Sequence, residues 1–272
     1  MTTEMKKLNI NLHGLSAQSF EPVVAGKRKA DFFNKQHGEL TGYDCPKCLN
    51  RGRIAIPKED GSVSFRDCDC MKIRRCVQKM EDSGMREVIE KYTFDAYKDK
   101  EEWQNIIKQG AMAYADKPEG WLLFCGQSGS GKTHLCTAVC RHLLLAGKEV
   151  RYMPWRQDAN EMKTMEPNRR EDTKKKLQNV PILFIDDLFK TARASDGSIN
   201  PTVADVNLAF DIINYRYTKR LATIISTERP PAELVEIDEA VGGRIVEMAQ
   251  RHTYSIERKP GRNYRLRNVV TV

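Results

Sequence analysis

The sequence lacks the features that mark a membrane-spanning or secreted protein. None of its apolar runs approaches the roughly 20 residues that a helix needs to cross a bilayer. The first 11 residues contain two lysines and no apolar segment follows them, so no secretory signal is indicated. There is also no repeat of the kind that builds solenoids. These absences predict a cytoplasmic protein of one or two globular domains.

Acidic residues are outnumbered by basic ones, 37 against 45, which gives a formal net charge of +8. This excess fits either an ordinary basic protein or one with an acidic partner, of which nucleic acid is the commonest. Trp155, beside Arg156, could stack on a base, although a core position is the simpler interpretation. One basic run could follow a phosphate backbone or form a solvated helix face, and it comprises Arg169, Arg170, Lys174, Lys175 and Lys176.

Short apolar segments alternate with helical ones in residues 118–272. Strands are expected at 121–124, 150–153, 182–185, 222–226 and 253–256, and helices at 133–145 and 201–220. This alternation is typical of a parallel β-sheet with helices on both faces, so we predict an α/β fold. Before it we expect an arm that is flexible or partly helical (1–42), a cysteine-rich module (43–78) and a helical linker (79–117).

A glycine-rich segment after the first of these strands matches the phosphate-binding loop pattern G-x-x-x-x-G-K-[ST] in full. Glycines let backbone N–H groups face phosphate oxygens, and the following helix presents its positive N-terminus. A chance glycine turn is the alternative, but the strand before it and the helix after it favour a nucleotide site. Lys132 would reach the β- and γ-phosphates, and Thr133 would bind Mg²⁺. We predict ATP binding by Gly126, Gln127, Ser128, Gly129, Ser130, Gly131, Lys132, Thr133 and His134.

Two aspartates follow the apolar strand predicted at 182–185. Asp186 is expected to hold Mg²⁺ together with Thr133, and Asp187 to polarise the attacking water. Exposed turn aspartates would be an alternative, but four apolar residues precede this pair in a chain with a P-loop. Along the chain, the strand at 150–153 lies between the P-loop and the acidic strand. Such an added strand is the arrangement of AAA+-type ATPases rather than of kinases or small GTPases.

Five cysteines gather within about 30 residues, and the absence of a secretory signal argues against disulfides. Cys45 and Cys48 form a C-x-x-C pair, and Cys68 and Cys70 a C-x-C pair, so the four could hold one tetrahedral ion. We predict a structural zinc site with a small hairpin between the pairs. Cys76 competes as the fourth ligand, and a redox or incidental thiol cluster is the alternative. Three further cysteines are expected in the core: Cys125, Cys136 and Cys140.

Together these motifs resemble those of DnaC/DnaI-type replicative helicase loaders of bacteria and phages, from about residue 43 to 267. The resemblance rests on the cysteine block, the P-loop and the segments Tyr92-Thr93-Phe94, Ile185-Asp186-Asp187-Leu188, Ile212-Ile213-Asn214-Tyr215-Arg216-Tyr217 and Thr223-Ile224-Ile225-Ser226-Thr227. It implies an AAA+ ATPase with a reduced or absent lid that uses ATP, Mg²⁺ and Zn²⁺. It also implies that the zinc-bearing region contacts a DnaB-type helicase, that the AAA+ domain binds single-stranded DNA, and that the chain forms a homo-oligomer with ATP or helicase.

The same resemblance implies roles for three places near the end of the chain. The sensor position that is commonly Asn in the family is Glu228 here, so Thr227 and Glu228 are both candidates for this catalytic role. Gly242-Gly243-Arg244-Ile245 resembles the segment of the arginine finger, which would place Arg244 near the γ-phosphate of a neighbouring subunit. A surface arginine at a helix start is the alternative. Arg265 resembles an arginine that contacts nucleotide or DNA.

The leading hypothesis is therefore an ATP-dependent loader that delivers a replicative helicase onto single-stranded DNA during initiation, with hydrolysis as the switch. An IstB-like transposition helper shares the AAA+ motifs and is the nearest alternative, but the cysteine block speaks against it. A third possibility is a non-hydrolysing adaptor, in which the nucleotide only stabilises a protein-binding scaffold.

Overall fold

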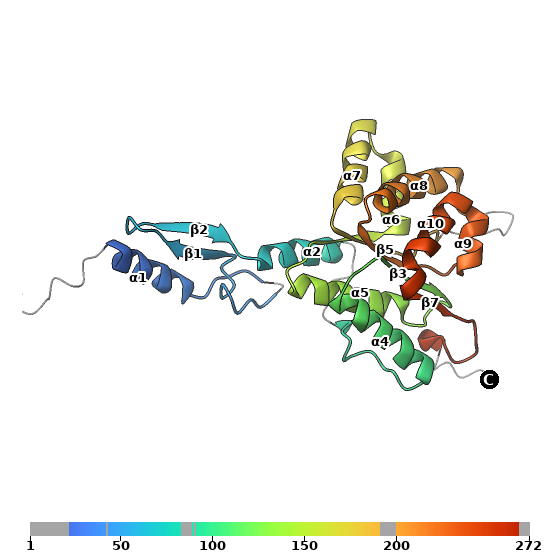
Figure 1. Ribbon diagram of the computed structural model, residues 1–272, viewed down its shortest axis with the longest axis horizontal. Helices are drawn as coiled ribbons and strands as arrows, with labels where there is room; N and C mark the ends of the chain where they lie inside the picture. Colours follow the sequence, from blue (N-terminus) through green and yellow to red (C-terminus); the bar gives the residue numbers. More distant parts are fainter. Residues whose placement is uncertain (1–21, 42, 83–88, 90, 191–199, 267–272) are drawn as a thin grey trace, which may run out of the picture. The chain divides into compact units, whose positions relative to one another are not determined.

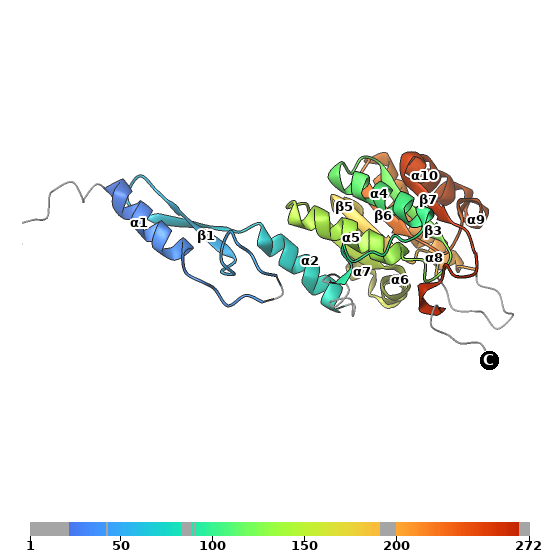
Figure 2. The same ribbon diagram turned by 90° about the horizontal axis from the view of Figure 1, so that it is seen from below.

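The computed structural model describes residues 22–41, 43–82, 89, 91–190 and 200–266. The chain divides into two compact units, Met1–Met71 and Lys72–Val272, whose elements are labelled in Figure 1 and seen from below in Figure 2. Within the described ranges, no helix is both long enough and apolar enough to cross a membrane.

The first unit is built from helix α1 (Pro22–Asn34) and a two-stranded hairpin. Strands β1 (Arg53–Pro57) and β2 (Val63–Asp67) pair antiparallel, with Arg53 opposite Asp67, so the hairpin predicted between the cysteine pairs is confirmed. Asn34 fastens the end of α1 to the hairpin, because its side chain both accepts from the N–H of Ala55 and donates to its carbonyl, each at 2.9 Å. Part of the predicted N-terminal arm is therefore a packed helix.

The second unit alternates strands with helices, as predicted for an α/β fold. Helix α2 (Cys70–Asp82) begins in the first unit, and its residues from Lys72 onward belong to the second. The other described elements of the second unit are α4 (Glu102–Asp116), β3 (Trp121–Gly126), α5 (Lys132–Leu145), β4 (Val150–Pro154), α6 (Trp155–Thr164), α7 (Pro167–Asn179), β5 (Ile182–Asp186), α8 (Val203–Thr218), β6 (Ala222–Ser226), α9 (Pro231–Ile237), α10 (Glu239–Ala249), the 3-10 helix η2 (Gln250–His252), β7 (Thr253–Ile256) and the 3-10 helix η3 (Tyr264–Leu266).

The strands of this unit form one parallel sheet in the order β4-β5-β6-β3-β7. The P-loop strand β3 and the acidic strand β5 are therefore separated in space by β6, whereas β4, which lies between them along the chain, is at the edge. Because the strands are parallel, the carboxyl ends of β3, β5 and β6 meet at one edge of the sheet. The predicted fold class is confirmed, and this edge positions the candidate site.

Alternation along the strands divides their side chains between two helical layers. Trp121, Leu123 and Cys125 of β3 belong to one buried cluster with residues of α6, α7, α8 and α10. Leu122 and Phe124, also fully buried, point to the opposite face. Figure 1 shows α6, α7, α8 and α10 above the sheet and α4 and α5 below it. Both faces are thus covered, which explains why the strands are almost entirely apolar.

Helix α8 begins two residues later than its sequence pattern predicts. Thr202 caps it by accepting from the N–H of Asp205 at 3.2 Å, and Asp205 accepts from the N–H of Thr202 at 3.0 Å, which is a reciprocal capping box. Pro201 therefore precedes the cap instead of lying in the first turn, where we expected it.

Candidate nucleotide and metal sites

The P-loop follows β3 and ends in the first turn of α5. Gly131 is the N-cap of α5 with φ 94°, and Gly126, the last residue of β3, has φ 105°. A Cβ on Gly126 would lie 2.0 Å from the carbonyl oxygen of Ile256, so only glycine fits there. The loop can therefore turn tightly enough for the free N–H groups at the start of α5 to face an anion.

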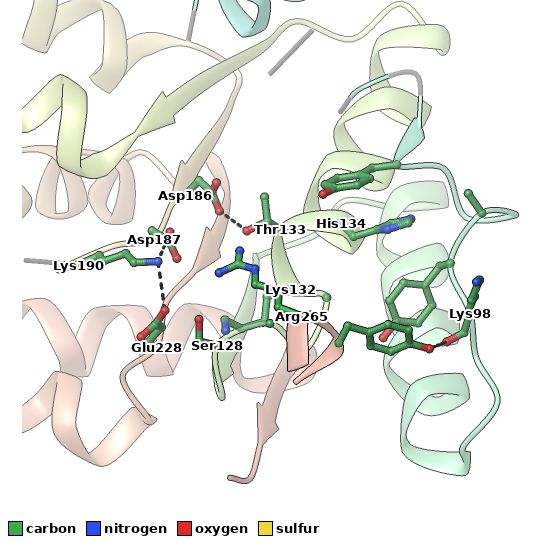
Figure 3. A pocket seen from close by; sticks show the side chains of 16 residues that line it. Lys98, Ser128, Lys132, Thr133, His134, Asp186, Asp187, Lys190, Glu228 and Arg265 are labelled. Carbon is green, nitrogen blue, oxygen red and sulfur yellow. Dashed lines mark hydrogen bonds and ion pairs between the residues drawn. The ribbon is translucent and has the colours of Figure 1, made fainter. Parts of the chain in front are cut away.

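A cavity of about 470 Å³ lies beside this loop and is shown in Figure 3. P-loop and α5 residues form its floor, residues after β5 and β6 form one side, and the segments at 92–98 and 264–265 form the other. The residues that line it are Tyr92, Ala96, Tyr97, Lys98, Ser128, Gly129, Gly131, Lys132, Thr133, His134, Asp186, Asp187, Lys190, Glu228, Tyr264 and Arg265. The structure thus brings together most of the predicted nucleotide residues.

Asp186 and Thr133 are in direct contact, as the magnesium prediction requires. The Thr133 hydroxyl donates to Asp186 Oδ1 at 3.0 Å, Tyr152 donates to Oδ2 at 3.1 Å, and Ser226 donates to Oδ1. Burial, together with the negative charge of Asp187, raises the pKa of Asp186 despite these three hydrogen bonds. A divalent cation would favour the ionised form, and a carboxylate beside a hydroxyl is a donor set that Mg²⁺ accepts. The two residues therefore fit the ion.

Asp187 lies one residue beyond β5 with φ 57°, in the left-handed region. Its N–H donates to Ser226 Oγ at 2.9 Å, and its carboxylate oxygen Oδ2 lies 2.8 Å from Lys190 Nζ. Lys190 also lies 3.1 Å from Glu228 Oε1. Burial lowers the pKa of Lys190, but its two carboxylate partners outweigh that effect and raise it. Asp187 thus borders the cavity in a position to orient a water, with a lysine as its neighbour.

Lys132 lies against the loop it belongs to. Its Nζ donates to the carbonyls of Gly126 at 2.9 Å and Gln127 at 2.8 Å, and its side chain is buried. Burial lowers the pKa of Lys132, while the carboxylates of Glu228 and Asp187 act in the opposite direction. A phosphate group would supply the negative charge that a buried ammonium lacks among carbonyls.

Aromatic side chains line the opposite end of the cavity. The rings of Tyr92 and His134 are stacked, with centroids 4.4 Å apart, and His134 Nε2 lies 2.9 Å from the Thr93 carbonyl. Burial lowers the pKa of His134, which favours the neutral ring at neutral pH. Arg265 also lines the cavity, and the N–H of Tyr264 fastens its segment to the P-loop by donating to the Gly129 carbonyl at 2.9 Å. The aromatic end offers stacking surfaces, which suit a base.

Five predicted site residues lie outside the lining of this cavity. Three of them belong to the P-loop: Gly126, Gln127 and Ser130. Ser130 is buried and donates to the Gln127 carbonyl at 2.7 Å, which stabilises the turn of the loop. The other two, Thr227 and Arg244, come from beyond the loop. Thr227 is buried and donates to the Leu188 carbonyl at 2.8 Å. Arg244 donates to the Ala240 carbonyl at 2.7 Å, on α10.

The cysteine cluster forms the second candidate site. The sulfurs of Cys45 and Cys68 are 3.8 Å apart, those of Cys48 and Cys70 are 3.5 Å apart, and all four lie within 4.8 Å of one another. A tetrahedral ion with Zn–S bonds of about 2.3 Å needs sulfurs roughly 3.8 Å apart. The four cysteines therefore fit zinc. Cys76 belongs to α2, and its side chain lies outside the described residues.

One cysteine of this cluster is prepared to act as a thiolate. The N–H of Gly52 donates to Cys48 Sγ at 3.3 Å. Burial opposes ionisation, but this N–H and the neighbouring thiols outweigh it and lower the pKa of Cys48 to about 7. The thiolate is the form that binds metal. The lowered pKa of Cys48 is compatible with a metal-ligand role for the cluster.

Sequence reasoning missed several residues of the nucleotide cavity. Lys190 carried no motif, and the tight turn that brings it to Glu228 has no pattern of its own. Tyr97 and Lys98 were likewise not predicted. The signal for the aromatic end is the segment at 92–94, which the sequence indicates only as a junction into the main domain and as part of the resemblance.

The comparisons with known proteins agree with this geometry. Residues 88–249 match the family model described as the bacterial DnaA ATPase domain. YqaM of Bacillus subtilis (strain 168) is 31% identical over 215 residues, which cover 73% of this chain and 66% of YqaM. The replicative helicase loader DnaC of Escherichia coli (strain K12) is 30% identical over 145 residues, 50% of this chain and 58% of DnaC. The chain thus spans somewhat less than two thirds of these relatives.

A solved structure shares the fold. AMPPCP-bound DnaA from Aquifex aeolicus superposes with a TM-score of 0.50 at 18% identity, covering 65% of this chain and 52% of DnaA. The family match covers more than half of the chain, and the P-loop, the acidic strand and four of the five sheet strands, β3 to β6, fall inside it. The chain therefore belongs to the bacterial DnaA ATPase domain family, it is an AAA+ ATPase, and its resemblance to DnaC/DnaI-type helicase loaders is confirmed.

Proposed function

We propose that this chain is an ATP-dependent loader that binds a DnaB-type replicative helicase and single-stranded DNA and delivers the helicase during replication initiation. The observation that carries the proposal is that one chain combines two sites. One is a nucleotide cavity in which Thr133 and Asp186 fit Mg²⁺, and the other is the cluster of four cysteines in the first unit. The nucleotide cavity alone would suit any AAA+ ATPase. The similarity to DnaC supports this choice.

In this proposal the nucleotide cavity is the switch. Lys132 and the P-loop hold the phosphates, Thr133 and Asp186 hold Mg²⁺, and Asp187 orients the attacking water. Mg²⁺ neutralises charge that develops on the phosphoryl group, while the chain's own residues position it. The aromatic end, with Tyr92 and Arg265, holds the nucleoside.

The cysteine unit would contact the helicase. Five large apolar side chains of this unit are exposed: Val23, Phe32, Leu40, Ile56 and Phe65. Exposed apolar side chains on so small a unit favour a protein partner. Zn²⁺ held by Cys45, Cys48, Cys68 and Cys70 would stabilise this unit, because it has few other buried residues.

Two further contacts complete the proposal. Exposed cations of α7, including Arg169, Arg170 and Lys175, would follow the phosphate backbone of single-stranded DNA. Arg244 would reach the γ-phosphate of a neighbouring subunit in a homo-oligomer. Its guanidinium lies 5.4 Å from the Phe210 ring centroid and 5.5 Å from that of Tyr217, which holds it on the outer helices α8 and α10 instead of in its own cavity.

The test is an affinity pull-down from host lysate with ATP, using the intact chain and three variants. Recovery of a hexameric replicative helicase is expected, and Cys45→Ser/Cys48→Ser should abolish it. Phe32→Ala should weaken it while leaving bound zinc unchanged, whereas Lys29→Ala, an exposed change on the same helix, should not. Recovery of a transposase, or of no helicase, would overturn the loader proposal.

A second experiment separates a hydrolysing loader from an adaptor. Asp187→Asn should retain bound ATP and block turnover, since it removes the carboxylate that orients water. If this variant loads helicase as well as the intact protein, hydrolysis is not the switch and the adaptor alternative holds.

A further inference from the structure

The turn after β5 fixes the position of Lys190. Asp187 and Phe189 both have positive φ, 57° and 58°, and the Leu188 N–H donates to the Ser226 carbonyl at 2.9 Å. Phe189 is fully buried and meets the Trp155 ring edge-on, with centroids 5.6 Å apart. Two left-handed residues and a buried anchor hold this backbone in one path. Lys190 follows directly and, as Figure 3 shows, extends between Asp187 and Glu228.

Lys190 is a cation on the acidic side of the cavity. Asp186, Asp187 and Glu228 all line it there, and Lys190 Nζ is 2.8 Å from Asp187 Oδ2 and 3.1 Å from Glu228 Oε1. Glu228 also accepts a hydrogen bond from Ser128 of the P-loop. The Glu228 carboxylate therefore lies beside the phosphate-binding loop. It would repel a bound phosphate group unless a cation lay between the carboxylate and the phosphate.

We propose that Lys190 contacts the γ-phosphate and thereby distinguishes ATP from ADP, with Glu228 as its partner when that phosphate is absent. This inference rests on the proposed binding of ATP in this cavity. The P-loop holds the α- and β-phosphates, Lys132 reaches the β- and γ-phosphates from the side of the loop, and the base lies at the aromatic end with Tyr92. The γ-phosphate therefore extends toward the acidic side, which is where Lys190 lies. An ammonium group has three donors, so Lys190 can hold a phosphate oxygen and still keep one carboxylate.

Glu228 gives the proposal its distinctive consequence. Without Lys190, its carboxylate would remain beside the P-loop and repel the γ-phosphate. Removing Lys190 alone should therefore weaken ATP binding by more than the lost contact, and removing Glu228 as well should restore part of it. The two substitutions should be non-additive for ATP and nearly without effect on ADP, because ADP has no phosphate group at this end.

The experiment measures dissociation constants of ATPγS and ADP for the full chain by calorimetry. Lys190→Met should weaken ATPγS binding about ten- to a hundredfold and ADP binding less than about threefold. Glu228→Gln should strengthen ATPγS binding several-fold, and the double variant should lie between them. Lys98→Met removes the same charge at the other end of the cavity and should affect both nucleotides alike. Lys190→Arg keeps the cation and should retain most of the discrimination.

Each outcome decides the matter. Equal weakening of both nucleotides by Lys190→Met, or no weakening, overturns the proposal. If Lys190→Met does not fold, Glu228→Gln still tests it, because unchanged ATPγS and ADP constants for that variant contradict the repulsion on which the argument depends. A wild-type chain that binds neither nucleotide would instead refute the ATP site itself, and with it the proposed function.

Discussion

Arg216 provides the sharpest test of how the second unit is held together. Its side chain is fully buried in α8, and its pKa is lowered to about 10 by burial, so it is charged at neutral pH. Within the part of the chain that the structure describes, none of its hydrogen-bond partners is a carboxylate. Its Nε donates to Thr223 Oγ1 at 3.0 Å, and its terminal nitrogens donate to the carbonyls of Leu177, Gln178, Val180, Pro181 and Ala222 at 2.5–3.5 Å.

These contacts allow the cost of Arg216→Met to be estimated. The bonds to Leu177 and Val180, at 3.0 and 2.7 Å, are buried, so methionine would leave both carbonyls without a donor. An unsatisfied buried acceptor costs about 1–3 kcal/mol. Relief of the buried charge offsets part of the loss, since desolvating an ion costs several kcal/mol. We expect a net loss of about 3–5 kcal/mol, a large fraction of the roughly 5–15 kcal/mol that holds a typical domain folded.

The assay is urea unfolding of the full chain followed by tryptophan fluorescence. All three tryptophans, Trp103, Trp121 and Trp155, lie in Lys72–Val272, so the signal reports this unit alone. With a slope of about 2 kcal/mol per molar urea, the midpoint should fall by roughly 1.5–2.5 M. Arg170→Met, an exposed change on α7, is the matched control and should shift stability by less than about 0.5 kcal/mol. An unchanged midpoint for Arg216→Met would refute the reasoning.

Three other predictions concern the metal sites and the α8 cap. Cys70→Ser should lower bound zinc from one equivalent to a small fraction in a colorimetric release assay, whereas Cys76→Ser should keep it; the reverse result would reassign the fourth ligand. Thr133→Val should raise the Mg²⁺ concentration needed for half-maximal hydrolysis at least tenfold, and an unchanged requirement would exclude its hydroxyl as a ligand. Burial raises the pKa of Asp205, but hydrogen bonds from Lys163 and Thr202 outweigh it and lower the pKa. Its contribution to stability is therefore complete above the ordinary aspartate pKa of 3.8 and lost as pH falls through the lower folded value. The stability advantage of the intact protein over Asp205→Asn should accordingly shrink below about pH 4, and a pH-independent difference would contradict this.

The sheet and the P-loop could be predicted from sequence because their signals are local. Most strands of the second unit are short apolar runs, and the predicted strand at 253–256 coincides with β7. The P-loop is contiguous, and its flanking strand and helix support it. The zinc site also follows from two close pairs of cysteines, although the spacing could not decide between Cys70 and Cys76.

What the sequence could not predict depends on contacts between distant segments. Helix α7 buries only Leu177, so its polar sequence carries no helical periodicity. The role of Arg216 was hidden because its acceptors lie near residue 180 and in β6. Successive residues beyond β6 point in opposite directions, so Thr227 turns toward Leu188 and Glu228 into the cavity, and only the structure could separate these two candidate sensors.

The sheet order explains how one residue can join both halves of the nucleotide site. Because β6 lies between β3 and β5, with Phe124 in register with Ser226, this serine reaches the acidic strand beside it. Its hydroxyl donates to Asp186 and accepts from the N–H of Asp187, while its carbonyl accepts from the N–H of Leu188. Asp186, Asp187 and the turn that carries Lys190 are therefore all attached to one strand end. Any movement of Lys190 toward a γ-phosphate would therefore act on the same end of β6 that carries Glu228.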